Sequence, residues 1–99
     1  MELLEEARIH VRVSSKAFDS ELEGLIAAAQ ATMVNGGVSK SLVYAEEPPA
    51  LVRHAVMTFV KARFGMDNDD AERFEQSFQS IIACLANSDA NAVYEEAES

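Results

Sequence analysis

The sequence predicts an all-α protein, a small bundle of about four helices. Two long segments carry their large apolar residues three or four positions apart, which is the repeat of one face of an α-helix. A third segment, directly after a Pro-Pro pair, is apolar nearly all round, as expected of a central helix. No alternating apolar and polar pattern predicts a strand longer than a few residues.

The first predicted helix covers residues 2–11. Ile9, Val11 and Val13 alternate, which also fits an extended segment, so we expect the helix to end near residue 11. The apolar side chains on one side of this helix are Leu3, Leu4, Ala7 and Val11.

The second predicted helix covers residues 18–34. Asp19 near its start suits the positive end of a helix dipole, and Gly36-Gly37 predicts its end because glycine readily closes a helix. Four alanines between positions 27 and 31 permit close approach of a neighbouring helix. Residues 36–47 show no repeat, so we expect an irregular loop there. The apolar stripe of the helix consists of Phe18, Leu22, Leu25, Ile26, Ala29 and Met33.

The third predicted helix covers residues 48–64. Pro48-Pro49 forces an extended approach and then presets the first helical turn. The only polar stripe is narrow and consists of His54, Thr58 and Lys61. A helix with so little polar surface is either central in the fold or covered by another subunit.

The fourth predicted helix covers residues 69–86 and repeats the apolar spacing of the second. We therefore expect one helical domain over residues 1–88, followed by a flexible acidic tail over residues 89–99. The tail has only two large apolar residues, Val93 and Tyr94. The stripe of the fourth helix consists of Phe74, Phe78, Ile81, Ile82 and Leu85.

Composition limits the possible functions. With 99 residues, 48% of them hydrophobic, the chain can form one folded domain but no deep enclosed active site. The net charge of -9 disfavours wrapping of DNA or of an anionic membrane. The chain has one cysteine, Cys84, which excludes an intramolecular disulfide and favours a reducing compartment. We expect no membrane span and no secretory signal, because no apolar run approaches about 20 residues and the N-terminus is acidic.

The acidic stretch 65–72, GMDNDDAE, raises the question of a metal site. A calcium loop starting at Asp67 would need a glycine at its sixth position and a carboxylate at its twelfth, and neither is present. We instead predict an interhelical turn, in which Gly65 ends one helix, Asp69 caps the next and Glu72 completes the cap.

No group of residues predicts catalysis. His10 and His54 have no second ligand at metal-binding spacing, and we interpret Cys84 as small core filler rather than as a nucleophile. Gly36-Gly37 lacks the Lys-Ser/Thr of a phosphate-binding loop. We therefore predict a protein that is not an enzyme and that has no cofactor or metal.

Three basic residues of the third helix allow two interpretations. Arg53, Lys61 and Arg63 could be edge side chains that pair with nearby acids of the same chain. They could equally form a contact with an acidic face of another copy.

The ordered features resemble a known family. The opening LLEEARIHVRV, the helix ELEGLIAAAQATM and the junction FVKARFGMDNDDAERFEQSF are similar to the small head-tail connector proteins of tailed bacteriophages and prophages, often labelled DNA-packaging proteins. The resemblance covers residues 2 to about 88, and residues 37–47 and the acidic tail after Asn87 depart from it.

This resemblance implies a structural role in the virion. Such a protein forms a ring of portal-matched symmetry below the portal, joins head to tail and lets DNA pass without specific binding. Its partners are further copies of itself, the portal protein and a tail or head-closure protein, and it resides in the host cytoplasm during assembly.

A ring requires two different adhesive faces on each subunit. The nearly all-apolar third helix offers more apolar surface than a small monomer easily covers. We expect the two segments without periodicity to supply docking anchors. The candidate interface residues are Val38, Leu42, Val43, Tyr44, Arg53, His54, Lys61, Arg63, Val93 and Tyr94.

Two other classes remain open at this point. A monomeric acidic helical adaptor or inhibitor of a basic partner protein explains the charge equally well. A helical transcription regulator would need a basic recognition helix, to which only residues 53–63 come close.

Overall fold

The computed structural model describes residues 2–64 and 70–88, and these are helical with short connections. The predicted all-α class is confirmed, and each predicted helix boundary lies within two residues of the observed one. The elements are α1 (Leu3–His10), the 3-10 turn η1 (Lys16–Phe18), α2 (Asp19–Asn35), α3 (Lys40–Val43), α4 (Ala50–Arg63) and α5 (Ala71–Ala86).

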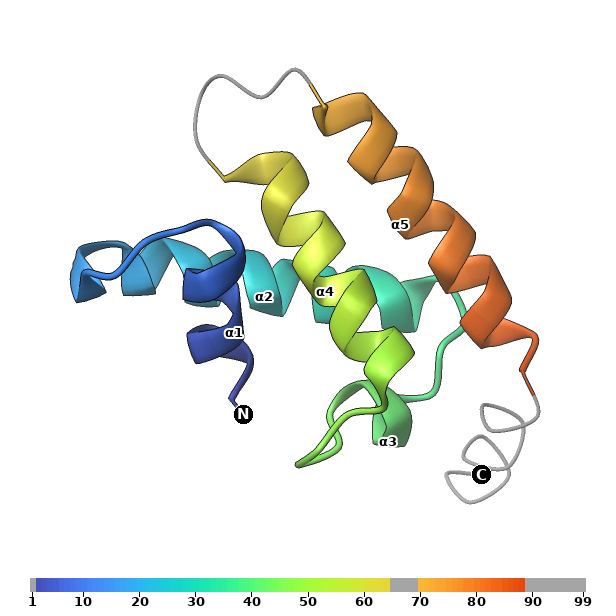
Figure 1. The fold of residues 1–99 in the computed structure, drawn as a ribbon. Helices are drawn as coiled ribbons and strands as arrows, with labels where there is room; N and C mark the ends of the chain where they lie inside the picture. Colours follow the sequence, from blue (N-terminus) through green and yellow to red (C-terminus); the bar gives the residue numbers. More distant parts are fainter. Residues whose placement is uncertain (1, 65–69, 89–99) are drawn as a thin grey trace.

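Helix α4 is the centre of the fold. It packs against α5 along one side and against α2 and α1 on others, and Figure 1 shows α2 crossing it while α5 runs beside it. The first of the two interpretations of its composition is therefore confirmed, because the chain's own helices cover it. Its buried residues are Val52, Ala55, Val56, Met57, Thr58, Phe59, Val60 and Ala62.

The end of α2 is a glycine-closed cap, as predicted. Gly37 has a φ of 103°, and its N–H donates to the Val34 carbonyl at 3.0 Å. The N–H of Val38 donates to the Met33 carbonyl at 3.0 Å, which completes a Schellman motif with Gly37 in the left-handed position. This cap turns the chain back against α2.

The segment 36–47 is irregular outside one short helical turn, as expected of a loop. It contains the single turn α3, and Val38, Leu42 and Val43 are buried in the core. Their side chains contact the chain's own interior and are not exposed anchors. The fourth proposed anchor, Tyr44, is 54% exposed.

Helix α5 begins slightly later than predicted. Asp70 occupies the N-cap position without a side-chain capping hydrogen bond, and its carboxylate lies 3.3 Å from Arg73. Glu72 lies in the first turn. The predicted roles of Gly65 and Asp69 lie outside the described residues.

Two further expectations concern Cys84 and the C-terminal tail. Cys84 is exposed, so its interpretation as core filler is wrong. The tail with Val93 and Tyr94 lies outside the residues described. In the described ranges, no helix combines the length and apolarity needed to cross a bilayer.

Candidate functional site

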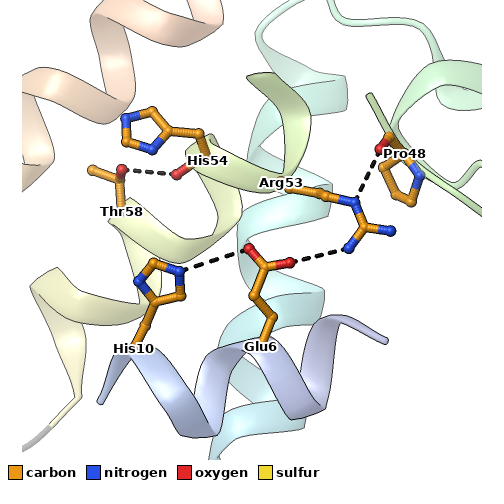
Figure 2. A network of polar contacts seen from close by, with 6 residues as sticks. All are labelled: Glu6, His10, Pro48, Arg53, His54 and Thr58. Atoms are coloured by element: carbon orange, nitrogen blue, oxygen red, sulfur yellow. Dashed lines mark hydrogen bonds and ion pairs between the residues drawn. The ribbon is translucent and has the colours of Figure 1, made fainter. Parts of the chain in front are cut away.

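A polar network joins α1 to α4 (Figure 2). The Nη1 of Arg53 lies 3.0 Å from Oε1 of Glu6, and its Nε donates to the carbonyl of Pro48 at 3.1 Å. Arg53 thus connects the start of α4, the segment before it and α1. Its guanidinium has partners within the subunit, so the first of the two interpretations of the basic residues applies to it.

His10 lies at the edge of the same network. Its Nε2 is 3.7 Å from Oε2 of Glu6. Burial lowers the pKa of His10, and the charge of Lys61 and the nearby His54 lower it further, against the opposing effect of Glu6. The imidazole is therefore neutral at neutral pH, and its contact with Glu6 is a loose polar contact rather than an ion pair.

The remaining predicted interface residues of α4 differ in their surroundings. Nη2 of Arg63 lies 2.7 Å from Oε1 of Glu75, and its guanidinium lies 4.4 Å from the centre of the Phe59 ring, so it links α4 to α5. Lys61 is half-buried, and His54 is exposed. Among the described candidate interface residues, His54 and Tyr44 are exposed, and their side chains take part in none of the ion pairs described above.

A two-point ion pair fixes the connection between α1 and α2. Arg8 donates to both carboxylate oxygens of Asp19, at 2.8 and 2.6 Å. The hydrogen bond from Arg8 lowers the pKa of Asp19 and raises that of Arg8. This pair joins the two sides of an edge of the molecule that runs from Ile9 to Phe18.

That edge combines basic and apolar side chains, and we call it the basic edge, consisting of Ile9, Arg12, Lys16 and Phe18. Ile9 is 62% exposed and Phe18 46%, although the rings of Phe18 and Phe64 form a T-shaped pair with centroids 5.7 Å apart. Arg12 and Lys16 are exposed. No single pattern in the sequence signals this edge, because Ile9 and Phe18 belong to two different predicted helices and Arg12 and Lys16 lie between those helices.

A groove of about 390 Å³ lies between α1, α2 and the segment before α4, and we call it the acidic groove. Its apolar lining includes Leu3, Leu4 and Ile26, and its carboxylates are Glu2, Glu23 and Glu46. Its described lining contains no basic residue. The groove could not be found from the sequence, because three separate segments form it.

Residues 4–92 match the family model described as phage connector protein. The chain belongs to the phage connector family. The match runs from within α1 through the end of α5, so it covers the whole packed domain of this connector protein. The resemblance found in the sequence is confirmed. No curated protein and no solved structure matches the chain significantly.

Connector proteins are structural components of phage particles that contact other head or tail proteins. In the part of the chain that the structure describes, no three potential ligands gather into a metal site. The acidic groove and the basic edge are the surface features whose shape and charge are suited to binding protein.

Proposed function

We propose that this connector protein forms a ring below the portal, joins the filled head to the tail and lets DNA pass through its bore. Membership of the phage connector family over residues 4–92 is the observation that carries the proposal. The partners are further copies of the chain, the portal protein and a tail or head-closure protein. The protein has no catalytic role and assembles in the host cytoplasm.

The charge of the chain supports the role of a conduit. The net charge of -9 gives each copy an electrostatic repulsion from the phosphate backbone. A ring with such subunits would hold DNA loosely as it passes. Sequence-specific readout would instead need basic side chains free to contact the grooves of DNA. Arg53 and Arg63 of the most basic helix are engaged with Glu6 and Glu75.

The proposal is tested by the native mass of the purified chain over a series of concentrations, with and without portal protein, together with electron microscopy of the same samples. We expect closed rings, formed by the chain alone or on the portal. Monomers under every condition would exclude ring formation. A salt-sensitive mobility shift of duplex DNA by the protein would instead support the alternative of a helical transcription regulator.

One observation favours a second candidate function. Because α4 is covered by the chain's own helices, the fold itself does not require a neighbouring subunit. A monomeric acidic adaptor that binds a basic protein partner is consistent with this closed core. Native mass measured in the presence of portal protein distinguishes the two functions. A ring-forming connector adds several copies of the chain, whereas the adaptor remains a monomer.

A further inference from the structure

We infer that the basic edge of one copy docks in the acidic groove of the next copy in the ring. This inference rests on the proposed ring and names the two surfaces that form its repeating contact. A ring needs a heterologous contact, in which two different patches of the same chain meet.

The charges of the two surfaces are complementary. The acidic groove carries the carboxylates of Glu2, Glu23 and Glu46 and no base among its described lining residues. The basic edge carries Arg12 and Lys16, both exposed. Opposite charges across an interface steer association and fix its register. The C-terminal tail is a poor occupant of the groove, because its charged residues are all acidic.

The apolar parts of the two surfaces also match. The groove has a lining of Leu3, Leu4 and Ile26 and a volume of about 390 Å³, within the range of about 300–1,000 Å³ typical of binding clefts. The basic edge presents Ile9 and Phe18, two of the most exposed large apolar side chains among the described residues. Docking would remove this apolar surface from water on both copies.

The backbone at Arg12 is a separate reason to assign a role to this edge. Arg12 has a φ of 60°, and the N–H groups of Arg12 and Val13 donate to the Ile9 and Arg8 carbonyls. This is the closing motif of α1, with an arginine where glycine is strongly preferred. A side chain in the left-handed region carries a conformational cost. Recognition of a neighbouring carboxylate would account for an arginine at this position.

The two surfaces lie at opposite ends of α1. Figure 1 shows the N-terminal end of α1 on one side and its connection to α2 leaving from the other. The groove uses the first residues of the helix, Leu3 and Leu4, and the edge begins at Ile9. A copy therefore does not fill its own groove with its own edge, and the contact propagates from copy to copy.

The test is a charge exchange between Arg12 and Glu23. We expect Arg12→Glu and Glu23→Lys each to weaken self-association roughly five- to tenfold, measured as the dissociation constant by sedimentation. A 1:1 mixture of the two variants should associate again with alternating copies, because the side chain at position 12 then meets a side chain of opposite charge at position 23 in every contact. The matched controls are Arg73→Glu and Glu72→Lys. Both residues are exposed on α5, and the two substitutions change the net charge by the same amounts as Arg12→Glu and Glu23→Lys.

Two further variants test the shape of the groove and the backbone at Arg12. Ala27→Phe fills the groove without changing charge and should reduce association. Arg12→Gly removes the guanidinium and relieves the left-handed backbone, so it should raise the melting temperature while association falls. A variant that merely damaged the fold would lower both.

The outcomes separate this inference from the proposed function. If the wild-type chain forms rings and the charge variants associate like their α5 controls, the assigned surfaces are wrong and the ring stands. If the single variants weaken association but their mixture does not restore it, the edge and the groove do not contact each other. If the wild-type chain never associates, both proposals fail.

Discussion

Asp19 shows at the scale of one residue how a charge pair shapes this fold. Its carboxylate receives two donors from Arg8, which joins the start of α2 to α1. From the sequence, Asp19 could be assigned only to the start of a helix. The partner could not be predicted, because the two side chains lie 11 positions apart on two different predicted helices, whose relative placement the sequence does not give.

The pairing predicts a pH dependence of stability. Since Arg8 lowers the pKa of Asp19 in the folded state, the stabilisation is present at neutral pH and is lost as the pH falls below about 4 through the folded-state pKa. We expect Asp19→Asn to lower the melting temperature at pH 7 and to differ little from wild type in strong acid. Thermal unfolding followed by circular dichroism over a pH series measures this.

The matched control is Glu21→Gln, in the same first turn of α2 and exposed. This substitution removes one negative charge from the same end of α2 as Asp19→Asn does. A difference for Asp19→Asn that stayed constant down to strong acid would show that the Arg8 pair is not responsible for it.

At the scale of elements, the contact between the end of α2 and α5 depends on the absence of a side chain. A Cβ added to Gly36 would lie 2.6 Å from Cγ2 of Ile82, far inside van der Waals contact. The φ of Gly36 is -82°, which any residue adopts. Packing of α5, rather than backbone conformation, therefore requires glycine at this position.

We expect Gly36→Ala to lower the free energy of unfolding by about 1 to 3 kcal/mol, the range for overpacking of a core. Ile82→Leu removes the branching methyl, so the double variant should lose less stability than the sum of the two single variants. Urea denaturation measures all three.

Gly24→Ala serves as the control, because a Cβ at Gly24 meets nothing within 4 Å. In an exposed helix interior, this change should stabilise the protein by up to about 1 kcal/mol. Additive effects of Gly36→Ala and Ile82→Leu would contradict the assigned contact.

Helices α2 and α5 could be predicted because each has an apolar stripe that repeats over several turns, and α4 because a nearly all-apolar segment follows Pro48-Pro49. The four-residue helix α3 could not, since one turn holds no repeat. Val38 and Leu42 illustrate the consequence. Apolar residues in an aperiodic segment fit an exposed anchor or a buried turn equally well, and the Schellman cap at Gly37, which places them inside, is a feature of the folded backbone.

At the scale of the whole molecule, the family could be identified from the sequence, whereas the two surfaces could not. The resemblance depends on the order and spacing of the helices, and both can be read directly along the sequence. The acidic groove combines α1, α2 and the segment before α4, so its charge and shape exist only after folding. Most of the apolar surface of α4 is covered by α5, α2 and α1, although Leu51 near its start remains 39% exposed.

Because the chain's own helices cover α4, we expect a single copy to fold without associating with another copy. A chain that needed its neighbour to close its core would become more stable as its concentration rose. For this chain we expect the midpoint of urea unfolding to stay constant across a hundredfold dilution series within the monomeric range. A midpoint that rose with concentration would show instead that folding and association are one event.

If the midpoint is constant, each copy is fully folded before it binds another copy. The growth of a ring would then be limited by collisions between folded copies. Under the proposed ring function, folded subunits would accumulate before assembly begins.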